Sequence, residues 1–464
     1  MPGSARQDIV REGEIAVYHT WSRCVQRAFL CGYDEATQTD FDYRREWIQL
    51  LLEYQASIFA CDIGNYSILS NHQHLIIRTR PDIAATWSDE EVAWRWKMAW
   101  PAWTDGQWVR QPSDEEIEEL LAEPHRIPIL RKNLASLSWF HARWKEPIAK
   151  LANSEMNTSG HFYEARFGSR ELCDEGSILC CSIYLDLNQI KAGMTTSLAE
   201  SDCSAIQDRL KAWRQGEANK SVKKFHKRKD AEGDYELETS HVEQLLADCF
   251  LSPIDERGPW MSPAESHTSE TSAVSTADTT DSASLRCSDE ASERITAVET
   301  ETESGADDVG DREEAATCTA ENTADRRSPD TRSDVEVGTG KAGTGRRVSR
   351  KIHRRWQQRR RRRASDNVIL SLPFPQYLQI AECTAAQLVA DTLVADAPEH
   401  APPSELELLL RQDDVAPANW RAAANNFAAW FHQAVGSNSN LKGILERLNR
   451  KWLQGIRHGR DVFT

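Results

Sequence analysis

The sequence predicts an α+β fold, and three observations support this prediction. The chain has 464 residues, of which 40% are hydrophobic, so two or three domains with a sizeable core are possible. Apolar residues alternate with period two, then follow helical spacing, and then alternate again within the first 80 residues. Most of the later apolar periodicity is helical, which indicates helices added to an amino-terminal sheet.

Four elements are expected in the order strand, helix, strand, strand. Residues 15–23 alternate in polarity and form the first strand, and residues 39–56 form an amphipathic helix. Residues 57–69 form a second strand region that is interrupted by turn residues. A third strand begins after the turn residue Asn71 and runs through Arg78. This order places the third strand inside the sheet.

The later elements are expected to be mainly helices. Ser113 and Glu116 have the spacing of a capping box, so a helix should begin there. The tryptophan-rich residues 83–108 are interpreted as a helix that packs its indoles on the core, with a base-stacking surface as the alternative. Further helices are expected over 130–153, 174–192, 241–250, 404–411, 419–435 and 441–453, a strand over 160–167, and a flexible basic loop over 217–230.

The formal net charge is −16, but the charged residues are unevenly distributed along the chain and are most concentrated in its central part. Residues 261–340 carry 20 acidic and 6 basic side chains, whereas residues 341–363 carry 12 basic side chains and no acidic one. We therefore predict a disordered acidic Ser/Thr-rich linker over 261–345, because it cannot bury enough apolar surface. This linker is followed by an arginine-rich arm over 346–363 and then by a small, mainly helical C-terminal segment over 366–464.

The arginine-rich arm has two interpretations that the sequence leaves open. It is either a solvated tail that neutralises the acidic linker, or a segment that binds DNA phosphates with salt-sensitive affinity. The DNA-binding interpretation assigns this role to Arg346, Arg347, Arg359, Arg360, Arg361, Arg362 and Arg363.

The composition also indicates in which cellular compartment the protein is expected. The 11 cysteines include no CxxC pair, and no export signal precedes them, so reduced thiols and a cytoplasmic location are expected. No run of 18 apolar residues exists in the sequence, and no membrane span is expected.

A pair of histidines begins the third predicted strand. His72 and His74 are two residues apart, so both imidazoles should lie on one face of the strand, whereas Gln73 should lie on the other. Two such histidines are often ordinary surface residues, but they could also bind one divalent cation. His19, on the apolar face of the first strand, is interpreted as a packed or hydrogen-bonded residue.

Tyr184 and Asn188 are four residues apart on a predicted helix and should share one face. A cation such as Mg²⁺ or Mn²⁺, bound by the two histidines, could take Asn188 or the neighbouring Gln189 as a third ligand; Asn188 is preferred because it shares the face of Tyr184. The metal would polarise a phosphodiester, and the Tyr184 phenol could attack phosphorus and form a 5′-phosphotyrosine.

These residues resemble the motifs of the HUH single-tyrosine transposases, the IS200-like family. The residues 184–193, YLDLNQIKAG, are similar to the YxxxNPxxAG helix of that family, and residues 18–23, YHTWSR, are similar to its first strand. Residues 160–167, GHFYEARF, resemble the GHFWEGRF stretch of its REP-associated tyrosine transposase branch. With the histidine pair, these motifs span residues 15–205 in the expected order.

The resemblance implies a ferredoxin-like (RRM-like) antiparallel sheet with helices, here within a catalytic domain over residues 1–250 that is extended by helical insertions. It implies metal-dependent cleavage and rejoining of single-stranded, hairpin-associated DNA in transposition, with Mg²⁺ or Mn²⁺ as cofactor. By position, His72, His74 and Asn188 would bind the metal and Tyr184 would be the nucleophile. The partners would be single-stranded or hairpin DNA, the protein a monomer or homodimer, and the location the bacterial cytoplasm, associated with the nucleoid.

Two residues depart from the family pattern, because Gln73 stands where a hydrophobic residue is usual and Gln189 replaces the usual proline. Tyr163 is a rival tyrosine that we interpret as structural. The main alternative to the enzyme is a domesticated, non-catalytic regulator that binds hairpin DNA. A third, weaker alternative is an RNA-binding protein, which would require exposed aromatic pairs on the sheet.

Overall fold

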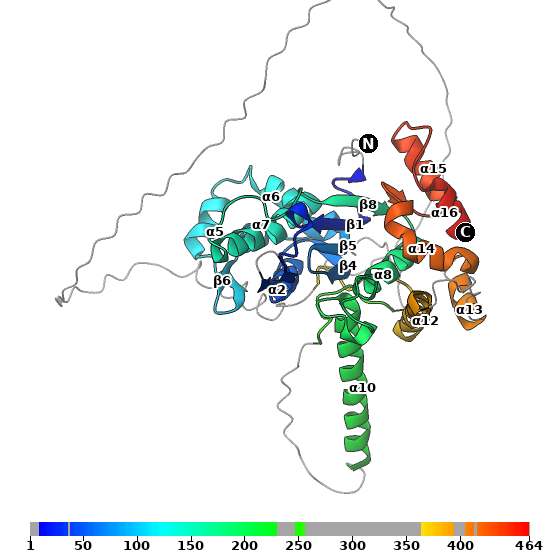
Figure 1. The fold of residues 1–464 in the computed structure, drawn as a ribbon. Helices are drawn as coiled ribbons and strands as arrows, with labels where there is room; N and C mark the ends of the chain where they lie inside the picture. The colour runs from blue at the N-terminus through cyan, green and yellow to red at the C-terminus, as the bar shows by residue number, and fades with distance from the viewer. Residues whose placement is uncertain are drawn as a thin grey trace, which may run out of the picture. The chain divides into compact units, whose positions relative to one another are not determined.

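The fold is organised around a five-stranded sheet in the order β4-β5-β1-β8-β9 (Figure 1). The strands are β1 (Ala16–Arg23), β4 (Cys61–Ile68), β5 (His72–Thr79), β8 (Gly168–Leu172) and β9 (Ala434–Val435). All neighbouring strands are antiparallel except β8 and β9, which are parallel. The α+β prediction is confirmed at this level, and β5, the third predicted strand, lies inside the sheet between β4 and β1.

This computed structural model describes residues 9–35, 38–229, 246–255, 363–393, 404–412 and 415–463. These residues belong to one compact unit that contains both ends of the chain. None of the helices described in these ranges is long and apolar enough to cross a membrane. The predicted acidic linker and all of the arginine-rich arm except Arg363 lie outside the described residues.

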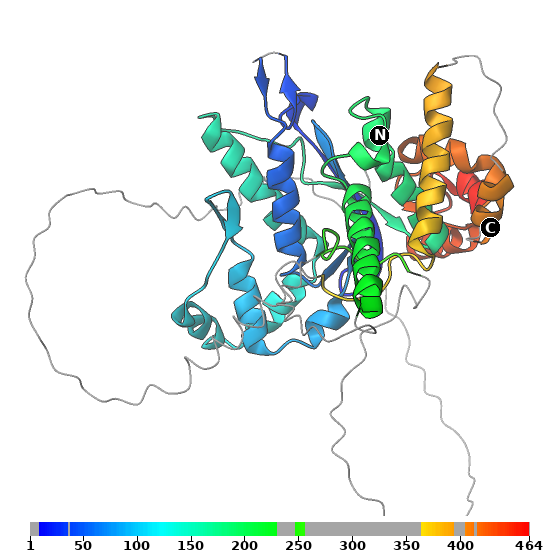
Figure 2. The ribbon, with the colours of Figure 1, turned by 90° about the horizontal axis from the view of Figure 1, so that it is seen from below.

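Side-chain alternation along the strands divides the core between the two faces of the sheet. Leu75 and Ile77 of β5 contribute to one hydrophobic cluster, whereas Ile76 contributes to the other. The first cluster contains residues of α2 (Arg44–Ala56), α4 (Asp89–Met98), α6 (Ile127–Leu134) and α7 (Leu137–Glu155). In Figure 2 these blue and cyan helices lie on one side of the sheet, and the yellow to red C-terminal helices lie on the other.

The second cluster joins the amino-terminal sheet to the C-terminal segment. It contains residues of α8 (Glu175–Asp186), α12 (Phe374–Leu393) and α14 (Pro417–Trp430), together with Val17 and Ile76 of the sheet. The C-terminal helices therefore share a core with α8, and β9 adds a strand to the same sheet. Further elements are α3 (Pro81–Ala85), α5 (Asp114–Leu121), α9 (Asn188–Lys191), α10 (Ala205–Lys229), α13 (Ser404–Gln412), α15 (Asn438–Arg447), α16 (Ile456–Val462), and the β2–β3 (Tyr33–Asp34, Thr39–Asp40) and β6–β7 (Ala102–Thr104, Gln107–Val109) hairpins.

Several local predictions hold. Ser113 and Glu116 form the capping box that begins α5. The helix predicted over the tryptophan-rich segment is confirmed only in part: α4 forms, and Trp87, Trp94 and Trp108 are buried in the core, but the β6–β7 hairpin follows in place of further helix and Trp100 is exposed. The second strand region forms β4, with a register shift between Ile63 and Asn65 where turn residues were noted.

Other boundaries differ from the predictions. Residues 160–167 form no strand, and only an isolated bridge joins Tyr163 to Cys24. Residues 217–229 of the predicted basic loop are instead the end of α10, because Glu, Ala, Lys and Arg favour a helix; residue 230 lies outside the described residues. The helix predicted over 130–153 is divided into α6 and α7. Residues 247–250, predicted to be helical, form a turn, and the first predicted residues of that helix lie outside the described part.

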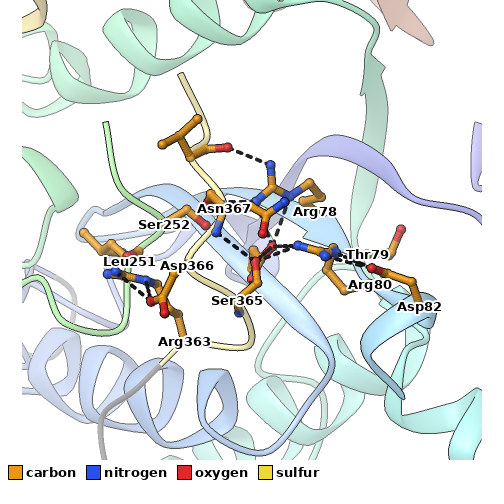
Figure 3. Close-up of polar contacts among 12 residues, drawn as sticks. Arg78, Thr79, Arg80, Asp82, Leu251, Ser252, Arg363, Ser365, Asp366 and Asn367 are labelled. Atoms are coloured by element: carbon orange, nitrogen blue, oxygen red, sulfur yellow. Dashed lines mark hydrogen bonds and ion pairs between the residues drawn. The ribbon is translucent and has the colours of Figure 1, made fainter. Parts of the chain in front are cut away.

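A buried carboxylate attaches the C-terminal segment to the sheet. Asp62 of β4 accepts hydrogen bonds from Arg78 and Arg80, and it also accepts from the backbone N–H and the hydroxyl of Ser365. Arg78 in turn donates to the carbonyls of Asn367 and Val368, as Figure 3 shows for Asn367. Each of these charges is neutralised within the network, which satisfies the usual condition for burying them.

We expect Asp62→Asn to lower the free energy of unfolding by about 3–5 kcal/mol, because Arg78 would remain buried without its anion and Arg80 would keep only Asp82. Urea denaturation followed by circular dichroism measures this change. Asp89→Asn is the control, since Asp89 pairs with Arg131 at the surface and should change stability by less than about 1 kcal/mol. Equal effects of both substitutions would contradict the role assigned to Asp62.

Candidate active site

The candidate site lies where the first residues of β5 meet helix α8. The imidazole centroids of His72 and His74 are 5.0 Å apart, and the Tyr184 ring of α8 lies 5.6 Å from that of His74. Gln73 lies on the opposite face, where its side-chain oxygen is 3.5 Å from the Tyr163 hydroxyl. Strand alternation thus brings the two histidines and Tyr184 together and separates them from Tyr163.

A neighbouring amide fixes the tautomer of His72. The Nδ1 atom of His72 is 2.7 Å from Oδ1 of Asn71, and the amide nitrogen of Asn71 donates to the carbonyl of Arg27. Because Oδ1 can only accept, Nδ1 of His72 carries the proton and Nε2 carries a lone pair. This is the tautomer in which Nε2 can bind a metal. Burial lowers the pKa of His72 to about 4, so the ring is neutral near pH 7.

His74 shares a hydrogen bond with a third histidine. Its Nδ1 atom lies 2.9 Å from Nε2 of His19, and burial holds the pKa of both imidazoles well below their ordinary value. One proton therefore lies between two neutral rings. When His74 donates it, Nε2 of His74 is left with a lone pair. The prediction that His19 is hydrogen-bonded is correct, but its partner was not foreseen.

Tyr184 is nearly enclosed, with 9% of its surface exposed. Burial raises the pKa of its phenol, and the nearby Arg170 guanidinium acts in the opposite direction. The helix that carries Tyr184 begins at the capping residue Asp174, as predicted, but it ends at Asp186 and a separate turn, α9, follows. Gly193 follows α9 with φ +68°, a conformation that suits glycine.

Asn188 and Gln189, the two alternatives for a third ligand, have different surroundings. The Gln189 amide donates to the Asp202 carbonyl at 2.5 Å and to that of Ile68 at 3.5 Å. The Nδ2 atom of Asn188 is buried and has no hydrogen-bond partner. The amide nitrogen of Gln189 is therefore paired and that of Asn188 is not, but a metal would bind the amide oxygen, so this difference does not distinguish the two residues as ligands.

These donors are compatible with a metal ion that takes two histidine nitrogens and other oxygen ligands. In the described ranges, no hydrogen bond engages Nε2 of His72 or His74, and no group of three His, Cys, Asp or Glu residues is placed to hold a metal. A site with two imidazoles would leave room for a carboxamide and for substrate oxygens. The sequence prediction has the same donor set.

Two further cations border the site, and sequence analysis did not identify them. Arg170 of β8 is buried, and burial lowers its pKa to about 10. Lys191 of α9 is exposed, but its Nζ atom lies 5.0 Å from the centroid of the Tyr184 ring, and desolvation of the ammonium by the surrounding residues lowers its pKa to about 8. Period-two alternation places Arg170 on one face of β8, but the sequence does not show which other elements pack on that face.

One residue of the predicted DNA-binding arm is described. Arg363 donates to the carboxylate of Asp366 and to the Leu251 carbonyl, as Figure 3 shows. The other six arginines assigned to DNA binding, Arg346, Arg347, Arg359, Arg360, Arg361 and Arg362, lie outside the described residues. Arg363 therefore has intramolecular partners where the arm meets the folded segment.

Comparisons with known proteins find little similarity. No family model matches the chain, and no curated protein matches its sequence. One solved structure, a REP-associated tyrosine transposase bound to a REP hairpin, is similar over 44% of this chain and 81% of the other. The identity is 10% and the TM-score is 0.24, which is too low to support an argument about function.

The depressed pKa of His72 predicts a specific dependence of stability on pH. Unfolding restores a pKa of about 6.5, so the unfolded chain takes up a proton first as the pH falls. Stability from this residue is therefore complete above about pH 6.5 and is lost as the pH falls toward 4. Between pH 7.5 and 5, wild type should lose roughly 1–2 kcal/mol more unfolding free energy than His72→Gln.

Urea denaturation of both proteins at the two pH values measures this difference. The buried Asp186 and Asp208, whose pKa values are raised to about 6, titrate in both proteins and cancel in the comparison. Parallel loss of stability in wild type and variant would show that His72 is not buried as described.

Proposed function

We propose that this chain is a single-tyrosine, HUH-type DNA strand transferase. It would cleave and rejoin single-stranded, hairpin-associated DNA in transposition through a 5′-phosphotyrosine. The observation that carries this proposal is the convergence of His72, His74 and Tyr184 in one buried site, with ring centroids 5.0 and 5.6 Å apart. The order and spacing of the sequence motifs give independent support.

Each residue has a chemical role in the proposed reaction. His72 and His74 would hold Mg²⁺ or Mn²⁺ through Nε2, with Asn188 as the third ligand, and His19 would orient His74. The bound metal would polarise the scissile phosphate and stabilise the leaving oxygen. Tyr184 Oη would bond to phosphorus as its proton leaves, while the bond from phosphorus to the 3′ oxygen breaks and that oxygen takes up a proton. The reverse attack by a 3′ hydroxyl rejoins the strand.

The fold is consistent with this proposal. We propose that β1, β4, β5 and β8 form a ferredoxin-like (RRM-like) sheet, because they follow the order second, third, first, fourth with antiparallel neighbours. In this arrangement the third strand is central and carries the histidines. The proposed partner is single-stranded or hairpin DNA, and the protein would act as a monomer or homodimer in the bacterial cytoplasm, associated with the nucleoid.

A second candidate function is a non-catalytic protein that binds hairpin DNA. The observation that favours it is the enclosure of the site, because Tyr184 is 9% exposed and His74 is 6% exposed. A substrate phosphate cannot reach either residue without a local rearrangement. The two functions make different predictions for covalent chemistry.

The full-length protein should form a covalent complex with labelled single-stranded hairpin DNA from the flanks of its own gene, detected on a denaturing gel. Formation should require Mn²⁺ or Mg²⁺ and should be abolished by chelator and by Tyr184→Phe, which removes only the attacking oxygen. Because the raised pKa keeps the phenol protonated near neutrality, the initial rate should increase between pH 7 and 9.

Tyr163→Phe is the matched control, since Tyr163 lies on the other face of the sheet beside Gln73. It should leave the covalent band unchanged. A band that survives Tyr184→Phe would assign the nucleophile elsewhere. Binding without a covalent product, for several flanking sequences with either metal, would favour the non-catalytic regulator.

The DNA-binding role of the arginine-rich arm is tested by replacing Arg359–Arg362 with glutamine. We expect weaker binding of hairpin DNA and a smaller dependence of log Kd on log salt, because each phosphate contact releases about one counterion. Fluorescence anisotropy at several salt concentrations measures both quantities. Arg363→Gln is the control for folding, since Arg363 contacts Asp366 and Leu251. An unchanged salt slope would favour the solvated-tail interpretation.

A further inference from the structure

Two cations next to Tyr184, the buried Arg170 and the exposed Lys191, have no carboxylate partner among the described residues. Arg170 is 3% exposed, and its guanidinium donates to the backbone carbonyl of Phe427 at 3.2 Å and to that of Phe431. Lys191 donates to the backbone carbonyl of Ala424 at 2.8 Å. Neither side chain forms an ion pair with any residue that the structure describes. All three acceptors belong to α14 or to the residue that follows it.

This arrangement differs from that of most buried arginines in the fold. Five others each pair with a carboxylate: Arg44 with Glu155, Arg45 with Asp42, Arg78 with Asp62, Arg80 with Asp62 and Asp82, and Arg95 with Glu91. Buried charges are normally paired, because an uncompensated charge in a low-dielectric interior is unstable. Arg170 has only carbonyl dipoles and the rings of Trp21 and Phe427 around its charge, and Lys191 has a carbonyl and the Tyr184 ring, so an anion of another molecule would supply the charge compensation that both lack.

Helix α14 also covers the ring of the proposed nucleophile. Phe427 stacks on Tyr184, with ring centroids 5.4 Å apart and an interplanar angle of 25°, and it meets His19 edge-on at 5.9 Å. The same residue thus supplies a flat ring for Tyr184 and a carbonyl for Arg170. A bound single strand of DNA would offer two kinds of group, the oxygen acceptors of a phosphate and the flat ring of a base. The carbonyls of α14 and the Phe427 ring are groups of the same two kinds.

We propose that Arg170 and Lys191 form an anion site for a phosphate of single-stranded DNA next to Tyr184, and that α14 occupies this site in the described conformation. The proposal rests on the proposed function for the identity of its ligand. DNA would replace the carbonyls of Ala424, Phe427 and Phe431 with phosphate oxygens, which make stronger, charge-assisted hydrogen bonds. Binding would therefore be coupled to release of α14.

The experiment measures binding without chemistry. Full-length protein with Tyr184→Phe, in the presence of chelator, is titrated against a fluorescein-labelled oligothymidylate, and the anisotropy gives Kd at several salt concentrations. Adding Phe427→Ala should lower Kd at least about fivefold, because α14 then competes less well. Adding Arg170→Gln or Lys191→Met to that protein should remove the gain and reduce the salt slope by about 0.7 for each cation.

The matched controls make the same kinds of substitution at residues away from Tyr184. Arg209→Gln removes another buried guanidinium that donates to two backbone carbonyls, those of Gly64 and Ser252. Lys145→Met removes an ammonium that, like that of Lys191, donates to a backbone carbonyl, although Lys145 is buried and Lys191 is exposed. Both should retain the gain in affinity. Phe427→Leu, which keeps most of the volume and loses the flat ring, replaces Phe427→Ala if thermal melting shows that the latter is unfolded.

Two results would overturn the proposal. An unchanged Kd in a folded Phe427 variant would make α14 an ordinary core helix, and a gain that persists in both cation variants would place the anion site elsewhere. Restoring Tyr184 and adding Mn²⁺ tests the proposed function separately. A gain in binding with no covalent product would support the anion site and contradict the proposed strand transfer. A covalent product whose yield is insensitive to all of these variants would support strand transfer and contradict the anion site.

Discussion

The alternation of side chains along β5 is the constraint on which the rest of the structure depends. β5 is paired with β1 along its whole length, which fixes its register, and with β4 from Gln73 to Thr79 across one register shift in β4. His72, His74, Ile76 and Arg78 consequently lie on one face, toward α8 and the C-terminal segment. A slip of one residue would exchange these side chains with Gln73, Leu75 and Ile77, which would bury the wrong residues on both faces.

The two ends of β5 perform different tasks on that shared face. Its first residues contribute the histidines of the candidate site, and Arg78, near its last residue, holds the backbone of Asn367 and Val368. The hydrophobic cluster between these ends includes Ile76 and residues of α8, α12 and α14. The position of α14 over Tyr184 thus depends on contacts made at the far end of the same strand, through a continuous core.

Local patterns were sufficient to predict most of the site. The spacing of His72 and His74 predicts a shared face, and the structure places them so, while the capping residue Asp174 and Gly193 mark the bounds of the region that carries Tyr184. Helix propensity and spacing depend on neighbours in sequence, which are visible in the chain. The roles in metal binding and catalysis remain proposals that the experiments above address.

Long-range contacts explain what the sequence could not predict. Residues 160–167 alternate in polarity like a strand, yet the ladder between β1 and β8 begins only at Gly168. Gly168 allows this close pairing, because a Cβ atom there would lie 2.2 Å from the Trp21 ring. Likewise, no local sequence pattern at Arg170 or Phe427 indicates that these two residues, 257 positions apart, form a hydrogen bond. Such pairs depend on the topology of the whole chain.

Both edges of the five-stranded sheet are partly covered in the part of the chain that the structure describes. The two-residue β9 pairs with β8 on one side, and on the other the backbone of Ser252 donates to Ile63 of β4 while Ile68 donates to the Cys203 carbonyl. Exposed edge strands are the usual template for joining one sheet to another, in aggregation as well as in assembly. These contacts therefore shorten the stretch of strand that a second copy could pair with, so segments that complete the fold also protect it from sheet-to-sheet aggregation.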